Sequence, residues 1–350
     1  MSASPGTLCI RADASSTMGM GHVMRCLALA QEWQNRGGSV CFISAIGIPS
    51  LHERLNKESM EVHALQAAQA SEEDLLETLA TARSHHSQWL VLDGYHFSPA
   101  FMLRIQEAGL HLLLLDDVAD RDLSGVEAVL NQNAYATVAM HQHFAPCPAL
   151  LLGASHTLLR REFLQYRGGH EVRQDASRVL VTLGGADPGN ATQLVMQAMG
   201  QLAARRLEVR LILGAANKHL GSLQEELGVL REKHAAEILV NPPDMPGLMA
   251  WSDVTITAAG SSCWELCCLG VPQLMLVTAD NQRMMPPYFI EHGLADVFGD
   301  MTEARVAELA TRLDTLLGDF EKRGRLSHAA RQVIDGNGAA RVVEFMLKQQ

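Results

Sequence analysis

Short apolar segments alternate with helical segments along the whole chain, and this order constrains the fold more than any other feature. In the first half, a helix is predicted over residues 23–36, and strands are predicted over residues 8–11, 40–44, 89–93, 111–116 and 126–131. In the second half the order restarts, with a helix over 190–203 and strands over 178–183, 207–213, 237–240, 254–257 and 273–277. Near-continuous apolar strands that alternate with helices are typical of parallel sheets covered on both faces. The sequence therefore predicts an α/β protein with two Rossmann-like, parallel-sheet domains.

The composition changes between the two halves, over residues 146–174, which contain prolines, Gly153 and a pair of glycines at 168 and 169. We place the linker there, which gives an N-terminal domain over 1–155 and a C-terminal domain over 175–328. Residues 329–350 are predicted as a helix, interrupted by glycine, that can pack back on the N-terminal domain. Ligands of doubly wound sheets bind beyond the carboxyl ends of the strands. Two such sheets that face each other would share one interdomain cleft.

The charge balance argues against large anionic partners. The 350 residues carry a formal net charge of −11, which repels nucleic acid and anionic membrane. No apolar run reaches the roughly 18 residues that span a bilayer, and residues 1–7 lack the features of a signal peptide. We therefore expect a cytoplasmic protein with a small-molecule ligand, no nucleic-acid partner and no stable membrane association.

The cysteine and histidine spacings do not indicate a metal site. The seven cysteines are scattered without a Cys-x-x-Cys pair, and the spacings of structural zinc sites are missing. His85 with His86, and His141 with His143, could hold a metal, but both pairs lie in polar or turn-rich segments where surface imidazoles are the commoner explanation. We expect reduced thiols, no metal and no cofactor.

The loop after the first predicted strand leads into a helix through Gly19, Gly21 and His22. Glycines let the backbone approach a ligand closely, and the start of a helix offers unpaired N–H groups to an anion. A dinucleotide fingerprint would place a further glycine where Met24 stands, so NAD and FAD are disfavoured. An imidazole near a helix N-terminus is kept neutral by the helix dipole, as a general base requires. The alternative is that His22 only caps the helix.

Two further glycine-containing loops precede helices in the second half. One contains Gly184 and Gly185, and the other contains Gly260 followed by two serines. Ser261 or Ser262 can serve as N-cap while other N–H groups bind a diphosphate. Glu265 lies one turn inside this helix and can accept hydrogen bonds from ribose, or it can instead complete a capping box with Ser262.

Asp116 and Asp117 follow a predicted strand and could be a metal pair or a paired acid and base. We favour a structural or substrate-positioning role for them. Paired carboxylates serve glycosidases because a poor leaving group must be protonated. A nucleoside diphosphate leaves readily as an anion, so one base and several N–H donors suffice.

As an ordered set, the motifs of this chain resemble those of the UDP-2,4-diacetamido-2,4,6-trideoxy-beta-L-altropyranose hydrolase family of pseudaminic acid biosynthesis, which is related to GT-B glycosyltransferases. The resemblance covers nearly the whole chain. The segments that carry it are RAD (11–13), GMGHVMRC (19–26), LDGY (92–95), LDD (115–117), LGGAD (183–187), AGSS (259–262) with Glu265, ADNQ (279–282) and DGNGA (335–339).

This resemblance implies a GT-B-like fold and hydrolysis of the UDP-sugar by water, with inversion at the anomeric carbon and no metal. On that mapping His22 is the general base, and Tyr95 and Asn281 position the sugar. Diphosphate and ribose are assigned to Gly260, Ser261, Ser262 and Glu265, and uracil to residues 241–245. The resemblance further implies substrate-binding roles for Arg11, Asp13, Gly19, Gly21, Gly184, Gly185 and Gln282.

Three other functions share this fold, and fold alone does not separate them. A glycosyltransferase that uses a UDP-amino-sugar donor would use the same base on an acceptor hydroxyl. A UDP-sugar epimerase would need acidic residues around the sugar C2 position. A nucleotide-sugar binding protein without activity would bind UDP and turn nothing over.

Overall fold

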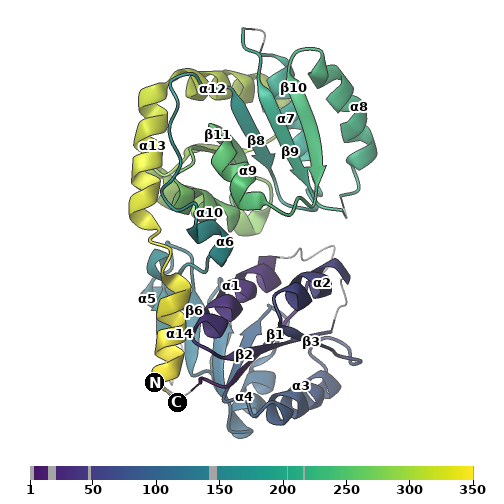
Figure 1. Ribbon diagram of the computed structural model, residues 1–350, viewed down its shortest axis with the longest axis vertical. Coiled ribbons are helices and arrows are strands. Elements are labelled where there is room, and N and C mark those ends of the chain that lie inside the picture. Colours follow the sequence, from purple (N-terminus) through teal and green to yellow (C-terminus); the bar gives the residue numbers. More distant parts are fainter. Residues whose placement is uncertain are drawn as a thin grey trace. The chain divides into compact units, whose positions relative to one another are not determined.

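The computed structural model describes residues 4–14, 21–45, 49–141, 148–202, 204–215 and 217–349. The chain divides into two compact units (Figure 1). Unit 1 contains Met1–Arg161 and Gly336–Gln350, and unit 2 contains Glu162–Asp335. Each unit is built on one parallel sheet with helices on both faces, which confirms the predicted pair of Rossmann-like domains.

The sheet of unit 1 has seven parallel strands in the order β3-β2-β1-β4-β5-β6-β7. Their bounds are β1 (Thr7–Ala12), β2 (Ser39–Ser44), β3 (Glu61–Ala64), β4 (Trp89–Asp93), β5 (His111–Leu115), β6 (Ala128–Asn131) and β7 (Ala149–Leu152). Every residue of the central strand β4 is buried, as expected for a strand with helices on both faces.

The helices of unit 1 cover the two faces of this sheet. They are α1 (Gly21–Asn35), α2 (Pro49–Lys57), α3 (Glu72–Ser84), α4 (Pro99–Glu107), α5 (Val138–His141), the 3₁₀ turn η1 (Ala154–His156) and α14 (Gly338–Lys348). Helix α14 lies beside α1 (Figure 1) and adds Val342, Val343 and Met346 to the apolar core on that face. The indole nitrogen of Trp89 donates to the carbonyl of Met346 at 3.1 Å. The end of the chain is thus packed into unit 1.

Unit 2 repeats the same architecture. Its sheet has six parallel strands in the order β10-β9-β8-β11-β12-β13. The strands are β8 (Arg178–Thr182), β9 (Glu208–Leu213), β10 (Ala235–Val240), β11 (Val254–Ala258), β12 (Gln273–Val277) and β13 (Asp296–Asp300). The helical segments are α7 (Ala191–Gly200), α8 (Leu220–Arg231), α9 (Met245–Trp251), α10 (Ser262–Leu269), η2 (Asp280–Gln282), α11 (Met285–Glu291), η3 (Glu303–Arg305), α12 (Val306–Gly318) and α13 (Phe320–Val333). The short helix α6 (Arg161–Leu164) begins at the boundary between the units.

Three strands were not predicted from the sequence, namely β3, β7 and β13. Strand β3 is four residues long, with polar residues at two positions and no buried residue. Strand β7 is equally short, and its four residues are apolar but mostly half-buried. Strand β7 falls inside the predicted linker over 146–174 but pairs with β6 in the sheet of unit 1. Strand β13 contains Gly299 with a positive φ of 86°, and its pairing with β12 shifts register there.

The C-terminal segment is divided between the two units. The predicted boundary at residue 329 falls inside α13, which belongs to unit 2, whereas α14 belongs to unit 1. Gly336 has a positive φ of 74° in the break between the two helices, a conformation that glycine adopts without strain.

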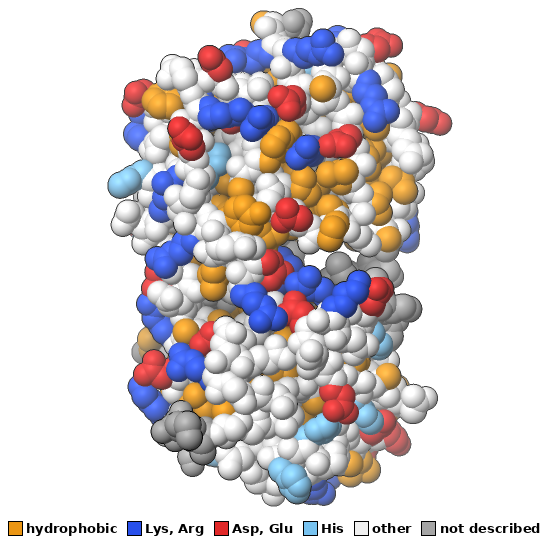
Figure 2. Space-filling view, viewed as in Figure 1, with side chains coloured by type: hydrophobic (Ala, Val, Ile, Leu, Met, Phe, Trp, Pro, Cys, Tyr) orange, Lys and Arg blue, Asp and Glu red, His pale blue; other side chains and the backbone are white. Residues whose placement is uncertain are grey.

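The surface shows no gathering of one charge sign on the face in Figure 2, where Lys and Arg are mixed with Asp and Glu over both units. Among the residues that the structure describes, no helix combines the length and the apolar composition needed to cross a bilayer.

Candidate active site

Polar side chains gather in unit 1 beyond the carboxyl ends of three neighbouring strands. His22 and Arg25 lie in the first turns of α1, and Asp93 is the last residue of β4. Asp117 follows β5, and Asn133 follows β6. We call this group, together with Tyr95, the His22 cluster. The position is the one where doubly wound sheets bind ligands.

The centre of the cluster is a contact between an imidazole and a buried carboxylate. The Nδ1 atom of His22 lies 2.6 Å from the Oδ1 atom of Asp93. The His22 side chain is 12% exposed, and the Asp93 side chain is fully buried. A carboxylate in this position accepts the Nδ1–H bond and so fixes the tautomer of the ring. The Nε2 atom is then the one that can accept a proton.

Arg25 connects the two carboxylates of the cluster. Its Nε donates to Asp93 Oδ2 at 2.6 Å and its Nη2 donates to Asp93 Oδ1 at 2.7 Å. Its Nη1 donates to Asp117 Oδ2 at 2.6 Å. Burial alone would lower the pKa of the guanidinium, but Asp117 and Asp93 hold that pKa well above its usual value. The cation is therefore a permanent feature of the cluster.

Asp93 stays ionised although it is buried. Burial alone would raise the pKa of its carboxyl, but the charge and hydrogen bonds of Arg25, with a smaller contribution from His22, hold that pKa well below its usual range. The thiol of Cys26 also lies 3.5 Å from Asp93 Oδ2 and can donate to it. Burial raises the pKa of this thiol well above its usual value, so it keeps its proton.

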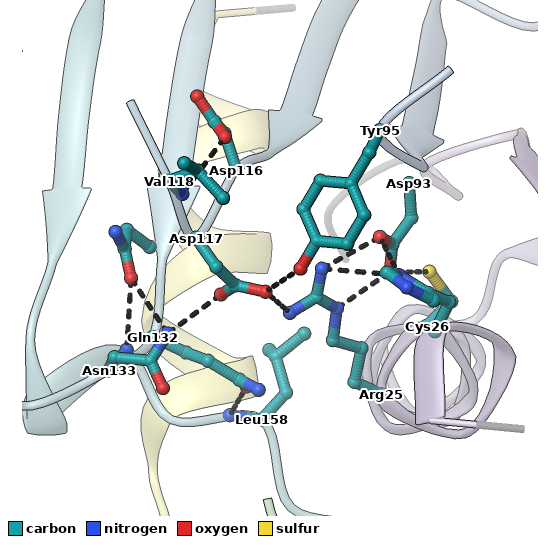
Figure 3. A network of polar contacts seen from close by, with 12 residues as sticks. Arg25, Cys26, Asp93, Tyr95, Asp116, Asp117, Val118, Gln132, Asn133 and Leu158 are labelled. Carbon is teal, nitrogen blue, oxygen red and sulfur yellow. Dashed lines mark hydrogen bonds and ion pairs between the residues drawn. The ribbon is translucent and has the colours of Figure 1, made fainter. Parts of the chain in front are cut away.

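Tyr95 borders the cluster on the solvent side. Its hydroxyl donates to Asp117 Oδ2 at 3.1 Å, and Asn133 Nδ2 donates to Asp117 Oδ1 at 2.7 Å. Figure 3 shows the Tyr95 hydroxyl and the Arg25 guanidinium converging on one carboxylate. The Tyr95 ring meets the His22 ring edge-on, with centroids 5.2 Å apart, and the residue is 48% exposed. Among the described residues of unit 1 that were predicted to contact substrate, Tyr95 places its side chain against His22.

Asp116 and Asp117 point in different directions (Figure 3). Asp116 is fully buried, and its Oδ1 accepts from the backbone N–H of Val118 at 3.2 Å. Asp117 instead joins Arg25, Tyr95 and Asn133. The two carboxylates therefore do not face one another as a metal pair or as a paired acid and base would.

Arg11 and Asp13 lie in the interior of unit 1. Arg11 donates from Nε and Nη2 to the two carboxylate oxygens of Asp74, at 3.0 and 2.7 Å, and its Nη1 lies 2.7 Å from Asp13 Oδ2. All three side chains are fully buried. The structure therefore pairs Arg11 and Asp13 internally, and their contact with substrate stays a prediction. Gly21 is the exposed first residue of α1, and Gly19 lies outside the described residues.

The predicted nucleotide-binding loops of unit 2 lie beyond the carboxyl ends of adjacent strands. Gly184 and Gly185 are exposed after β8, and Gly184 has a positive φ of 91°. Asp187 in the same loop accepts from the N–H groups of Ala191 and Thr192 at 2.9 and 2.8 Å. The Asp187 carboxylate therefore accepts hydrogen bonds from N–H groups at the start of α7. The backbone of Gly184 and Gly185 is exposed to solvent.

The second loop of unit 2 joins β11 to α10. Ser261 is exposed at the N-cap position, with Gly260 before it and Ser262 as the first helical residue. The Ser261 backbone is helical, with φ −57° and ψ −28°, and its side chain makes no capping hydrogen bond. The prediction that a serine side chain caps this helix therefore does not hold for Ser261. Glu265 is half-buried in the first turn of α10.

The remaining predicted residues also follow strand ends of this sheet. Asn281 is exposed in η2 after β12. Gln282 is tied to the same loop, because its Oε1 accepts from the N–H of Thr278 at 2.9 Å. Asn241, after β10, has a positive φ of 46°, and Asp244 caps α9 by accepting from the N–H of Gly247 at 2.9 Å. The loops proposed for uracil, diphosphate and sugar thus share one edge of a single sheet.

The sequence alone did not single out Arg25, Asp93 or Asn133, which the structure places in the His22 cluster. Two of them stand in motifs that were used only to recognise the resemblance. The spacing between His22 and Arg25 was an available signal, because residues three apart lie on one face of a helix. A second available signal was Asp93 itself, an ionisable residue directly after four apolar residues of β4.

Comparison with known proteins supports the same fold. Residues 178–331 match the family model described as the glycosyltransferase family 28 C-terminal domain. The spore coat polysaccharide biosynthesis protein SpsG of Bacillus subtilis (strain 168) is 24% identical over 339 residues, which cover 96% of both chains. The UDP-2,4-diacetamido-2,4,6-trideoxy-beta-L-altropyranose hydrolase of Campylobacter jejuni is 23% identical over 285 residues, covering 81% of this chain and 96% of that protein.

Among solved structures, the UDP-GlcNAc 2-epimerase of Neisseria meningitidis bound to UDP-GlcNAc superposes with a TM-score of 0.68 at 13% identity. The match covers 98% of this chain and 100% of the epimerase. Together with the family match, this likeness confirms the predicted GT-B-like fold class.

Proposed function

We propose that this protein is a UDP-sugar hydrolase that attacks the anomeric carbon with water, inverts its configuration and releases UDP. The observation that carries the proposal is the contact between His22 Nδ1 and Asp93 Oδ1 at 2.6 Å, with the carboxylate buried and held ionised by Arg25. We name UDP-2,4-diacetamido-2,4,6-trideoxy-beta-L-altropyranose as the substrate, because the chain is similar to a hydrolase of that compound over 81% of its length.

The chemistry needs one base. Water gives a proton to His22 Nε2 as its oxygen bonds to the anomeric carbon, and the bond from that carbon to the phosphate oxygen breaks. The imidazolium that forms is stabilised by the Asp93 carboxylate, as in other carboxylate–histidine pairs. UDP departs as an anion, so no acid has to protonate it. A single base on the face opposite the leaving group gives inversion.

We assign the nucleotide to the loops of unit 2. The match of residues 178–331 to a glycosyltransferase domain supports this assignment. Exposed backbone at Gly184 and Gly185, with the hydroxyls of Ser261 and Ser262, supplies donors that a diphosphate requires. Gly260 is half-buried and its N–H donates to the carbonyl of Ala258 at 2.7 Å, so we assign it a role in shaping the turn. Glu265, one turn into α10, provides a carboxylate for the ribose hydroxyls. On this view the N-terminal domain supplies the base and the C-terminal domain binds UDP.

A glycosyltransferase is the second candidate, and the family match in unit 2 favours it. In that case His22 would take its proton from an acceptor hydroxyl instead of water. The geometry of the His22 cluster serves both reactions, because the Nε2 atom accepts a proton from either O–H group.

The two candidates are separated by a release assay without acceptor. Purified protein is incubated with a panel of UDP-sugars that includes the diacetamido-trideoxy-altrose compound, and UDP and free sugar are quantified together. We expect stoichiometric UDP and free sugar from that compound, with an inverted anomer in the first NMR spectra. UDP that appears only after an acceptor is added would establish the transferase. A sugar that stays attached to UDP but changes configuration would establish an epimerase.

A further inference from the structure

A second group of chemically reactive side chains lies in unit 1, near the amino-terminal ends of its strands. Cys9, Cys41 and Glu61 are register partners on β1, β2 and β3, with Cys9 opposite Cys41 and Cys41 opposite Glu61. Register partners in a parallel sheet project to the same face. The three side chains therefore form one row, in which Cys9 and Glu61 flank Cys41.

A histidine completes this row from the helix that covers it. His85 is the C-cap residue of α3, and its Nε2 lies 3.4 Å from Glu61 Oε1. One donor atom each from Cys41, Glu61 and His85 lie within 4.8 Å of one another. In the part of the chain that the structure describes, this is the one group of three or more such residues that converges in this way.

We propose that Cys41, Glu61 and His85 bind a zinc ion, with Cys9 as the fourth ligand. We call these four residues the Cys41 cluster. Thiolate, imidazole and carboxylate together are the donor set that zinc accepts. Two ligands at about 2.1 Å from a tetrahedral ion lie about 3.4 Å apart, which is the separation between His85 Nε2 and Glu61 Oε1.

The sequence hides this site because its ligands come from β1, β2, β3 and α3. The intervals between them lack the short Cys-x-x-Cys or His-x-x-x-His spacings by which structural zinc sites are recognised. His85 was considered for metal binding from its neighbour His86, but His86 has a positive φ of 51° and is exposed outside the cluster. The partners of His85 come from the sheet instead.

The position of the ion defines its role. Glu61 is the first residue of β3, and Cys41 and Cys9 are in the first halves of β2 and β1. The His22 cluster follows the last residue of β4, at the opposite ends of the parallel strands. An ion in the Cys41 cluster would therefore connect the edge of the sheet to α3 without touching the reacting groups. Its binding energy would appear as stability of unit 1.

The experiment measures zinc directly. The full-length protein is stripped with chelator, titrated with Zn²⁺ in competition with a chromophoric chelator, and separately loaded with Co²⁺. We expect one zinc per chain and a thiolate-to-cobalt charge-transfer band. His85→Gln and Cys41→Ser should each weaken zinc binding at least tenfold and reduce that band. His86→Gln and Cys268→Ser are the matched controls, and both should bind zinc as the wild type does.

Thermal unfolding gives a second readout that does not depend on turnover. Zinc should raise the Tm of the wild type and of His86→Gln in a concentration-dependent way, and should raise the Tm of His85→Gln clearly less at the same zinc concentration. His85 is partly exposed, so its variant remains informative if Cys41→Ser fails to fold. Absence of a tight equivalent of zinc in the wild type would overturn the proposal. Equal zinc affinity in His85→Gln and His86→Gln would overturn it as well, and would leave a simple His85–Glu61 ion pair beside two thiols.

Discussion

Arg25 donates two parallel hydrogen bonds to Asp93, from Nε to Oδ2 at 2.6 Å and from Nη2 to Oδ1 at 2.7 Å. A two-pronged pair of this kind fixes the plane of the carboxylate as well as its charge. The Oδ1 atom that faces His22 is therefore held in position by a cation on the same helix. The orientation of the proposed base is set by a residue that need not contact substrate.

The first prediction concerns Asp93→Asn. The amide cannot enforce the same tautomer of His22, and we expect kcat to fall by roughly 10² to 10⁴, as when the orienting carboxylate of a catalytic histidine is neutralised. Binding of UDP, measured by calorimetry, should stay within about threefold. A fall in UDP affinity that matched the loss of kcat would instead assign Asp93 to the nucleotide.

The same variant tests the electrostatics of the cluster. Because the folded-state pKa of Asp93 is lowered, its ionised form stabilises the fold above the unfolded-state pKa of about 4, and this contribution is lost as pH falls through the lower, folded-state value. The free energy of unfolding in urea should thus be higher for wild type than for Asp93→Asn at pH 7. The difference should narrow steadily below about pH 4. A difference that does not change with pH would show that the charge of Asp93 is not what stabilises the fold.

The second prediction is that His22→Asn lowers kcat by roughly 10² to 10⁴ while the affinity for UDP changes only a few-fold, because a general base acts on the chemical step. His328→Asn, an exposed substitution on α13, is the matched control and should keep full activity. If His22→Asn turned over at the wild-type rate and only its Tm fell, His22 would be a structural residue at the start of α1.

The sequence predicts the fold well where strands are apolar throughout. The bounds of β4 and β12 are those predicted, because both strands are wholly buried and each contains four consecutive apolar residues. Strand β3 is short and contains Glu61 and His63, so its local pattern does not separate it from a loop. Strand β7 is a run of four apolar residues, but it lies among the prolines and glycines that were assigned to the linker. Their place in the sheet follows from pairing with β2 and β6, which is tertiary information.

The candidate site was predictable to a smaller extent. His22 was found because a glycine turn and a helix start are local features. The Asp93 partner lies 71 residues away along the chain, and only the adjacency of β1 and β4 brings the two together. Arg11 shows a second limit of local sequence information. It precedes the glycine loop in sequence, but β1 points its side chain inward to Asp74, a partner 63 residues away that the sequence pattern did not indicate.

The third prediction separates the ring of Tyr95 from its hydroxyl. Tyr95→Phe loses the hydrogen bond to Asp117 but keeps the edge contact with His22, so kcat/KM should fall no more than about threefold, as for one exposed hydrogen bond. Tyr95→Ala also loses the ring contact, worth about 0.5–1.5 kcal/mol, so its kcat/KM should be lower than that of Tyr95→Phe by up to about tenfold.

The same pair of proteins tests the protonation state of the Tyr95 hydroxyl. Burial, then the charge of Asp117, raises the pKa of Tyr95 well above its usual value. The hydroxyl therefore stays protonated, and wild type and Tyr95→Phe should have pH–rate profiles of the same shape from pH 6 to 9. If the wild-type pH–rate profile had a basic limb that is missing in Tyr95→Phe, the hydroxyl would titrate in this range and the prediction would be wrong.

The fourth prediction concerns Glu265→Ala. Hydrogen bonds from ribose to a carboxylate are worth about 1.5–3 kcal/mol, so the affinity for UDP should fall roughly ten- to a hundredfold. The measurement is calorimetric titration with UDP, with Glu265→Gln as the variant that keeps an acceptor oxygen and should lose less. A change confined to the Tm, with UDP affinity intact in both variants, would assign Glu265 to the structure of α10.

The fifth prediction is that Arg11 stabilises unit 1 and does not contact substrate. Arg11→Met would leave the carboxylates of Asp13 and Asp74 buried without their cation, and breaking a buried pair in this way costs about 3–5 kcal/mol. We expect a lower urea midpoint and a lower Tm, with KM for the UDP-sugar and affinity for UDP unchanged within about twofold in the folded fraction. Arg11→Lys keeps a positive charge without the two-pronged geometry, so it should lose less stability than Arg11→Met. It is the variant to measure if Arg11→Met does not fold. A tenfold rise in KM for a stable Arg11→Lys protein would return Arg11 to the substrate site, and would mean that the interior of unit 1 opens when substrate binds.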